Sequence, residues 1–426
     1  MQHLKDHSRR YALSNELHAR PFPPMEVGQS ALIFAVKPER HAARRDKTID
    51  FQHLIALLDR LGAAHPQPNA THFSADVGPF FLKWECHTEF TTYTVIMRTP
   101  EGRAFDPTGF DVFPKEWLDE MPGVCVTSAI VRCEEMPNSE TIKQRLTEWF
   151  VPESLAVSYV LDRAAVVASD LRVDTAGFTR FVLFADVGTG TRRLGRIMQR
   201  LFEIEVYKSM SMLGLARASG LSRDMGPIDA RLTTLTKDMA QDDVPHEQTL
   251  HALLEISGEL EQLTAATEFR FGATAAYQAI VNTRIEVLRE ERFEGRQTFH
   301  EFMMRRYDPS MRTIQSTEGR LRRMLERAIR AGDLLRTRVD VARSKQNQDL
   351  LTSMNERADT QLRLQRTVEG LSVVAISYYA VSLVAYGLYP LAEVLDLSKG
   401  WLMALITPLV VGTVWWLVSR IRAKFH

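Results

Sequence analysis

The segment GLSVVAISYYAVSLVAYGLYPLA, residues 370–392, decides the architecture of this chain. It contains no charged residue, and a second such segment, GWLMALITPLVVGTVWWLVS, follows at 400–419. Each is close to the roughly 20 residues that an α-helix needs to cross the hydrocarbon core of a bilayer. The alternative is a pair of soluble core helices, which normally carry a charged stripe. The sequence therefore predicts two transmembrane helices that form a C-terminal hairpin.

The charges around these segments predict their orientation. Basic residues precede the first segment and follow the second, where 420–426 form a basic tail: Arg357, Arg363, Arg366, Arg420, Arg422 and Lys424. The connecting loop holds Glu393, Asp396 and a single Lys399. By the positive-inside rule we expect both termini in the cytoplasm and the short loop outside.

The first apolar segment has one face of small and hydroxylated side chains. They recur at steps of three and four residues, which places them on one side of a helix: Ser372, Ala375, Tyr379, Ser382, Tyr386 and Tyr389. Such residues favour helix–helix contacts in lipid, because hydroxyls facing hydrocarbon would stay unpaired. The face either packs against the second apolar helix or meets identical subunits around a shared axis. We hypothesise that this face meets identical subunits, so that the protein is a homo-oligomer.

A long helix is expected ahead of the membrane, over residues 310–369. No proline intervenes there, and apolar residues keep a spacing of about 3.5 residues, which is a short coiled-coil seam: Leu321, Leu325, Ala328, Leu335, Val339 and Ala342. Beyond Gln346 the seam becomes polar. We expect a stalk helix, which a break near Gly319 or Gly332 would shorten.

The remainder is expected to form an α+β cytoplasmic domain over 1–190 and a helical region over 191–309. Strands are predicted at 30–36, 80–86, 90–98, 124–133, 164–173 and 178–186, with a helix at 46–61 and two hairpins among the strands. After about residue 190 the strand patterns stop. Separate helices are predicted, divided by prolines 227, 245 and 309: 192–217, 229–239, 247–267 and 273–292.

Composition excludes several classes of function. The 53 basic and 53 acidic residues give a formal net charge of zero, so no overall field would attract nucleic acid. Cys86, Cys125 and Cys133 form no C-x-x-C pair, which fits a reducing compartment better than a disulfide framework. The N-terminus is polar and lacks the apolar run of a secretory signal.

The sequence contains no recognisable catalytic motif, so we predict neither an enzyme nor a cofactor. The segment ADVGTGTRRLGR, residues 185–196, has the glycine spacing of a phosphate-binding loop. Arg196 and Ile197 stand where that motif needs Lys and Ser or Thr, which favours a plain strand-to-helix turn. The twelve histidines show no H-E-x-x-H pattern, and no G-x-S-x-G occurs.

The N-terminal segment NELHARPF, residues 15–22, has an unusual mixture of polar side chains. Asn15, Glu16, His18 and Arg20 are candidates for binding an anion or a partner. The alternative is that they fix the N-terminal arm to the body of the protein, since ordering a polar terminus requires such contacts.

Three segments together resemble a bacterial family of predicted membrane-anchored proteins of unknown function. They are NELHARPF (15–22), GFTRFVL (177–183) and QNQDLLTSMNERADTQLRLQRTVEGLSVVAISYY (346–379), so the resemblance spans nearly the whole chain. It implies a location in the bacterial inner membrane and implies no activity.

The layout is also similar to that of the CorA-type metal-ion transporters. That family has an N-terminal α/β domain, a long stalk helix, two C-terminal spans and a basic tail. Its first span ends in Tyr-Gly-Met-Asn, where this chain has Tyr386-Gly387-Leu388-Tyr389. The missing asparagine is the group that the resemblance would assign to a hydrated cation, and its replacement weighs against magnesium transport.

Two functions follow as expectations. The first is a homo-oligomeric, CorA-like membrane protein that moves a cation or small solute. The second is a non-transporting scaffold that holds a cytoplasmic binding domain at the inner membrane. The expected partners are membrane lipid, further copies of the chain and, in the first case, a metal cation, but no nucleic acid.

Overall fold

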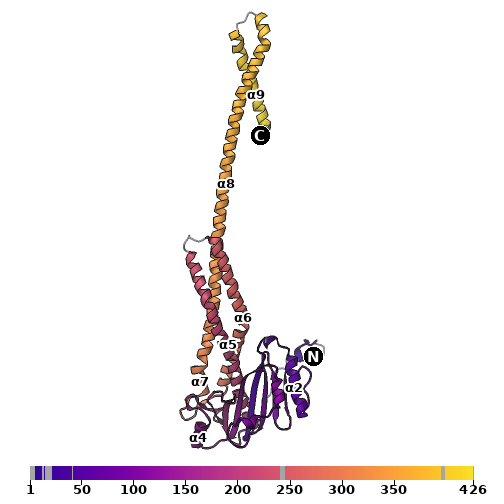
Figure 1. Cartoon of the computed structure of the whole chain (residues 1–426), viewed down its shortest axis with the longest axis vertical. Coiled ribbons are helices and arrows are strands. Elements are labelled where there is room, and N and C mark those ends of the chain that lie inside the picture. Colours follow the sequence, from indigo (N-terminus) through magenta and orange to yellow (C-terminus); the bar gives the residue numbers. More distant parts are fainter. Residues whose placement is uncertain are drawn as a thin grey trace. The chain divides into compact units, whose positions relative to one another are not determined.

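The computed structural model describes residues 5–11, 14, 22–40, 42–239, 245–394 and 399–425 (Figure 1). The chain divides into two compact units. The first comprises Met1–Asp243 and His251–Ala331, and the second comprises Val244–Leu250 and Gly332–His426. Residue 190, where the sequence changes from strand to helix patterns, lies within the first unit.

The first unit is an α/β structure built on one mixed sheet. Among the described residues, nine strands follow the order β2-β3-β4-β1-β5-β8-β7-β6-β9. Only β5 and β8 pair in parallel, and the other neighbours are antiparallel. The strands are β1 (Gln29–Lys37), β2 (His72–Asp76), β3 (Phe81–Cys86), β4 (Thr91–Arg98), β5 (Val124–Glu135), β6 (Ala156–Val160), β7 (Ala165–Ser169), β8 (Thr179–Ala185) and β9 (Glu291–Arg292).

Short helices surround the sheet, and α2 (Lys47–Leu61) contributes most to its core. Asp46 caps the N-terminus of α2, and Gly62 ends it with a left-handed backbone (φ 64°) that glycine adopts without strain. Leu54 and Leu57 of α2 pack with the fully buried Trp84 of β3. The remaining short helices are η1 (Ala42–Arg44), η2 (Pro107–Phe110), α3 (Lys115–Asp119), α4 (Ser139–Trp149) and η3 (Pro152–Ser154).

Both hairpins predicted from the sequence are present. Strands β3 and β4 pair around the connector that contains His87, and β7 pairs with β8 around the turn 174–177. Strands β2, β6 and β9 were missed. The expectation that strands stop near residue 190 was wrong, because Glu291 and Arg292 add β9 to the sheet edge beside β6. A strand of two residues gives no readable alternation.

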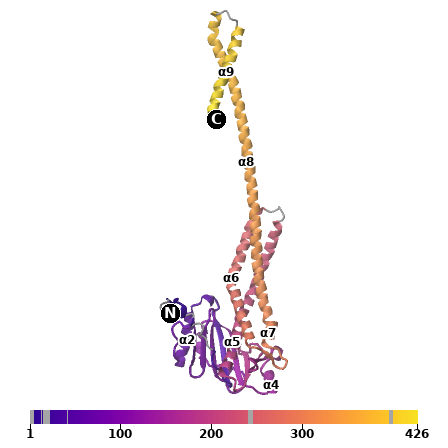
Figure 2. The same ribbon diagram turned by 180° about the vertical axis from the view of Figure 1, so that it is seen from behind.

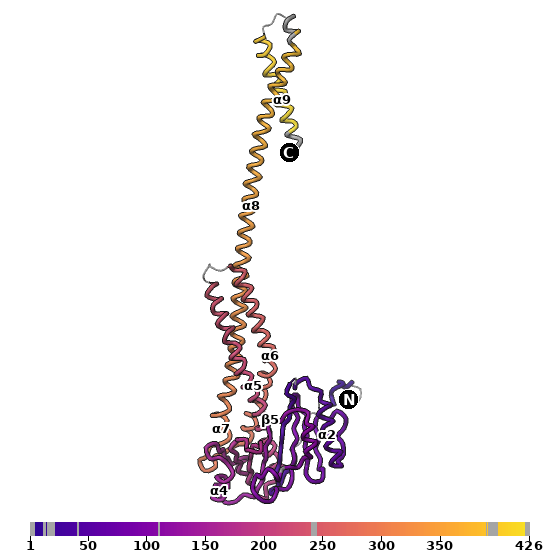
Figure 3. The backbone as a smooth tube through the Cα atoms, viewed as in Figure 1, coloured from indigo at the N-terminus to yellow at the C-terminus, as the bar shows by residue number. Residues whose placement is uncertain are grey.

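Three helices of the first unit run side by side, as Figures 1 and 2 show: α5 (Thr191–Asp238), α6 (His246–Glu286) and the beginning of α8. Asp229 of α5 binds Arg320 and Arg327 of α8, and Arg231 of α5 binds Glu259 of α6. The tube in Figure 3 follows the chain from the sheet into this bundle, where α5 packs against β5.

The sequence-based prediction placed more breaks in these helices than the structure has. Pro227 lies inside α5 rather than ending a helix, and the two segments expected at 247–267 and 273–292 form the single helix α6. A proline removes only one backbone donor. The buried Met225 and Ile228 on either side of Pro227 hold the helix in the bundle.

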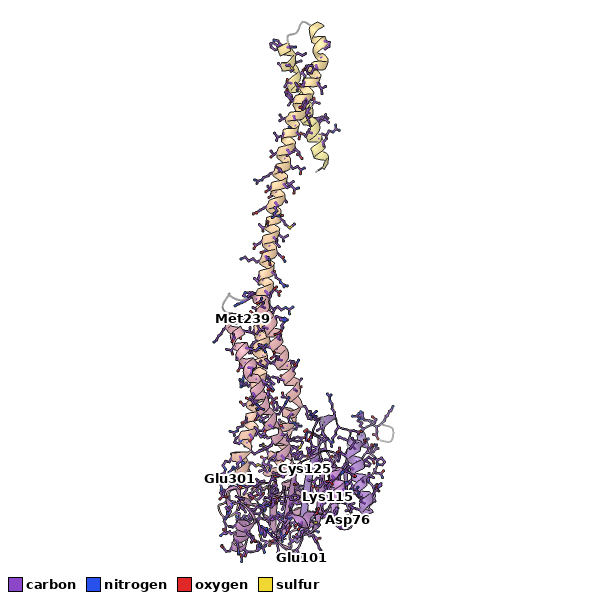
Figure 4. All side chains as sticks on the ribbon, in the orientation of Figure 1. Asp76, Glu101, Lys115, Cys125, Met239 and Glu301 are labelled. Atoms are coloured by element: carbon purple, nitrogen blue, oxygen red, sulfur yellow. The ribbon has the colours of Figure 1, made fainter. Side chains whose placement is uncertain are left out.

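The predicted stalk and the first apolar segment belong to one helix, α8 (Asp308–Val394), which the short α7 (Phe299–Arg306) precedes. Thr298 and Glu301, the latter labelled in Figure 4, form a capping box at the start of α7. Neither Gly319 nor Gly332 interrupts α8. Of the predicted seam, Leu321 and Ala328 are buried in the helical bundle of their own chain.

The second unit contains the rest of α8 and the helix α9 (Lys399–Phe425). Within the described residues, the helical segments Phe299–Leu388 and Lys399–Ile421 each contain a stretch long and apolar enough to cross a membrane. Only 11% and 6% of these stretches is buried inside the protein, whereas the core helix of a soluble protein would be mostly covered.

Candidate functional site

A polar cleft of about 240 Å³ lies between the sheet and α5 in the first unit. Lys83 and Glu85 alternate along β3 and therefore share the face of the sheet that lines the cleft. Gln199 and Glu203, four residues apart, share one face of α5. Arg284 of α6 completes the ring of polar groups.

These side chains form a continuous network. The Lys83 ammonium donates to Gln199 Oε1 at 3.1 Å and pairs with Glu85 at 3.1 Å. The Gln199 amide donates in turn to Glu203 Oε1 at 2.9 Å, and Glu203 also forms an ion pair with Arg284. The Lys83 side chain is only 6% exposed, so these partners offset the cost of removing its charge from water.

One end of the cleft is aromatic. His87 and Phe90 stack with ring centroids 4.3 Å apart, and the Tyr207 ring meets both edge-on. Phe22 and Pro23, at the start of the described segment that leads into β1, also line the cleft. The site thus combines an apolar wall with a charge-balanced floor, which suits a small ligand that is polar and carries no net charge.

A second buried cluster stands beside this aromatic end. Glu89, 1% exposed, forms an ion pair with Arg270, and it accepts a hydrogen bond from the Tyr277 hydroxyl at 2.8 Å. Burial and the bond to Glu89 raise the pKa of Tyr277, so this hydroxyl stays protonated. Burial, together with the nearby Arg270 charge, lowers the pKa of Lys37. The cluster ties the β3–β4 turn to α6.

The cysteines and the possible metal ligands do not form a site in the described part of the chain. No three side chains from His, Cys, Asp and Glu gather there as metal ligands would. Cys86 and Cys133 are buried, and burial raises the pKa of each thiol, to about 12 for Cys133. A raised pKa disfavours the thiolate that nucleophilic chemistry needs. Cys125, labelled in Figure 4, is exposed.

The glycine-rich segment after β8 is the strand-to-helix turn that the sequence favoured. Strand β8 ends at Ala185, and Gly190 is the residue before the first turn of α5. Gly195 packs against the backbone of Pro23. The other N-terminal candidates, Asn15, Glu16, His18 and Arg20, lie outside the described residues.

The polar face of the first apolar segment is mostly uncovered within the second unit. Tyr379 and Tyr386 are 67% and 82% exposed, and Ser372 and Ala375 are also exposed. Ser382 is partly covered, and its hydroxyl donates to the Tyr378 carbonyl at 2.9 Å. The side chain of Tyr389 lies outside the described residues.

Ser377, which is not one of these six residues, is a buried position of the same segment. Ser377 is 6% exposed, and within the described chain its hydroxyl has no hydrogen-bond partner. A hollow of about 590 Å³ between α8 and α9 brings Ser382 and Tyr386 together with Lys399.

The sequence alone does not predict the network of Lys83, Gln199, Glu203 and Arg284 in the cleft. Lys83 and Gln199 are 116 positions apart, and Glu203 and Arg284 are 81 apart, so no local motif joins them. The one usable signal is that Lys83 and Glu85 put two charges on the same face of the otherwise apolar strand β3.

One family matches almost the entire chain. A family model described as "Protein of unknown function (DUF3422)" matches residues 5–425. No curated protein has a matching sequence.

Proposed function

The chain belongs to the DUF3422 family, and we propose that it is a membrane-anchored protein of the bacterial inner membrane that carries a cytoplasmic binding unit. The observation that carries this proposal is the exposure of large apolar side chains along α8 and α9. Leu371, Val374 and Leu383 are 66%, 68% and 72% exposed, and on α9 Leu405 and Leu409 are 68% and 66% exposed. Contiguous apolar surface of this extent is unfavourable in water and favourable in lipid.

The proposed topology has two spans with both termini in the cytoplasm. Basic residues flank the hairpin on its two cytoplasmic sides, as the positive-inside rule requires. At the end of α9 the Arg420 guanidinium lies 5.1 Å from the centre of the Trp416 ring. An indole beside an arginine is typical of a membrane interface, where the ring stays in the headgroup region and the charge reaches water.

Membrane extraction and cysteine labelling test the anchor and its topology. In a Cys125→Ser background, Lys399→Cys reports on the loop and Lys115→Cys reports on the first unit. We expect a membrane-impermeant maleimide to label Lys399→Cys in intact spheroplasts and Lys115→Cys only after permeabilisation. Full-length protein recovered in the soluble fraction without detergent would contradict the proposal.

The binding role rests on the cleft between the sheet and α5. Its polar groups come from β3, α5 and α6, and each described ion pair in it joins two different elements or alternate residues of one strand. Preorganised polar groups beside an aromatic wall are typical of small-ligand sites. In this role the two spans only hold the binding unit at the membrane, and reconstituted vesicles show no flux.

A second candidate function is a homo-oligomeric transporter of CorA-like layout. Two observations favour an oligomer. Nearly every residue of α8 between 340 and 369 is exposed, including Leu350, Met354 and Leu364, and a single uncovered helix gains little stability in water. The exposed tyrosine face described above is available to a second copy of α8 in the same bilayer.

Disulfide crosslinking in native membranes tests the oligomer. Tyr379→Cys is expected to form a disulfide with a second copy, because this position is 67% exposed within its own chain. Ser377→Cys is the matched control, since that position is buried within one chain. Equal crosslinking of both variants would argue against the tyrosine face.

Ion flux separates the transporter from the scaffold. In vesicles containing the full chain, a transporter carries at least one of the ions tested, and Ser382→Leu and Tyr386→Leu alter that flux. Crosslinking at residue 379 without flux of any tested ion would contradict the transporter and support an oligomeric scaffold.

A further inference from the structure

Four arginines surround an open hollow of about 710 Å³ in the first unit. Arg193, Arg196 and Arg200 occur at steps of three and four residues and therefore lie on one face of α5. Arg289 joins them from the segment that follows α6. This arginine hollow shares no lining residue with the polar cleft.

Uncharged backbone carbonyls hold two of these arginines in place and do not neutralise their charge. Arg193 donates to the Leu161 carbonyl at 2.6 Å, and Arg200 donates to the Val287 carbonyl at 2.9 Å. Asp162 lies 2.9 Å from Arg289 and 3.8 Å from Arg193. Within the described chain, the side chain of Arg196 has neither a hydrogen bond nor an ion pair, and that of Arg200 has no ion pair.

This gathering of positive charge is unfavourable without a counterion. Burial is the main cause that lowers the pKa of Arg200, and the like charges of Arg196, Arg284 and Arg289 add to it, while Glu203 offsets part of the effect. Among the described residues that line the hollow, Glu286 is the one acidic side chain beside four arginines. A bound anion would remove the repulsion and use guanidinium groups that the fold already positions.

We infer that the arginine hollow binds a small anion that carries two or more phosphate groups. Guanidinium forks pair bidentately with phosphate oxygens, and several arginines around one hollow match several phosphates better than a single carboxylate. The lining contains no aromatic ring on which a base could stack, so charge dominates recognition. The site does not depend on the proposed anchor, oligomer or polar cleft.

Both a soluble oligophosphate and a lipid headgroup with two phosphates offer this chemistry. The test uses the full chain in a neutral detergent. One arm titrates sodium tripolyphosphate by calorimetry, and the other adds cardiolipin to the micelles, with phosphatidylcholine as the uncharged control. Binding of tripolyphosphate identifies a soluble ligand, and binding of cardiolipin alone identifies the headgroup.

Substitutions connect the binding to the hollow. Arg196→Gln should weaken binding about tenfold, because a charge-assisted contact is lost. Arg200→Lys keeps the charge but removes the fork, and it should weaken binding as well. Arg223→Gln is the matched control: its side chain is also exposed on α5 but lies outside the hollow. Binding should decrease as NaCl is raised.

Thermal unfolding gives a readout independent of the titration. The Arg196 side chain makes no hydrogen bond or ion pair in the described chain, so Arg196→Gln should leave the midpoint of the ligand-free protein unchanged or raise it. The same variant should reduce the rise in midpoint that the ligand causes. The inference is overturned if neither probe binds to the wild-type protein, or if Arg196→Gln and Arg223→Gln bind equally well.

Discussion

The carbonyl oxygen of Pro23 lies directly over Gly195, 1.8 Å from the point where a Cβ on that residue would stand. The main chain ahead of β1 therefore crosses the first turns of α5 at a distance that only glycine permits. The amide of Met25 donates to the Thr191 carbonyl in the same region. Phe22, the last residue of NELHARPF, lines the polar cleft, and the Pro23 that follows it is seated against α5.

Gly195→Ala should destabilise the protein by about 1–3 kcal/mol, because the contacting atoms are backbone and cannot move aside as a side chain could. The free energy of unfolding of the two proteins gives the comparison.

Gly220→Ala is the control in the same helix. A Cβ at Gly220 would meet no atom within 4 Å, so the change should be neutral or stabilising. Equal effects of the two substitutions would show that the Pro23 contact is not tight in solution.

Removing the charge of Glu89 should be more costly than removing a surface charge. Glu89→Gln leaves Arg270 without its buried counterion, and breaking such a pair costs about 3 kcal/mol. Glu318→Gln removes one partner of an exposed pair, 3.5 Å from Arg322, and should cost less than about 0.5 kcal/mol. A loss at Glu89 as small as that at Glu318 would mean that water reaches the cluster.

His53 should make the fold less stable at mildly acidic pH. Its ring lies between the Tyr93 hydroxyl (3.1 Å) and the Trp117 carbonyl (3.0 Å), and burial lowers its pKa. Below about pH 6.5 the unfolded chain binds a proton at this histidine before the folded chain does, so stability falls as pH decreases through that range.

The His53→Gln variant separates this contribution from that of other groups. It removes the titration, so its unfolding midpoint should fall less than that of the wild type between pH 7.5 and pH 5. Parallel curves for the two proteins would contradict the assignment.

Asp229 should stabilise the helical bundle at neutral pH and lose this effect in acid. Hydrogen bonds from Arg320 and Arg327 lower its pKa, so its contribution is complete above the unfolded pKa of about 3.9 and disappears as pH falls through the folded value. We expect Asp229→Asn to cost about 1 kcal/mol at pH 7, with the gap to wild type closing below about pH 4. A gap that does not narrow at all as the pH falls from 5 to 2 would point to a packing effect.

Local patterns in the sequence predicted the local parts of the fold. The β3–β4 and β7–β8 hairpins and the apolar segments of α8 and α9 each carry their signal within a short window. The helix breaks placed at Pro227 and near residue 270 failed because burial on both sides of a weak helix position outweighs its propensity. Met225 and Phe271 are such buried residues.

Strands β2 and β9 and the polar cleft could not be predicted from short sequence windows, for a different reason. Strand β2, HFSAD, is a partly exposed edge strand with no apolar run, and β9 is a strand only because β6 lies beside it. Lys83 becomes a binding-site candidate only when α5 brings Gln199 within 3.1 Å. Such pairings arise from topology rather than from spacing along the chain.

The two-residue strand β9 also determines when the edge of the sheet is covered during synthesis of the chain. Its pairing with β6 covers a sheet edge that would otherwise offer unpaired backbone groups to another chain. Strand β9 follows α6 in the sequence. During translation this edge of β6 therefore stays unpaired until α5 and α6 have left the ribosome. Chaperone contacts in the cell are therefore expected to concentrate on nascent chains of intermediate length, before the apolar C-terminal helices are synthesised.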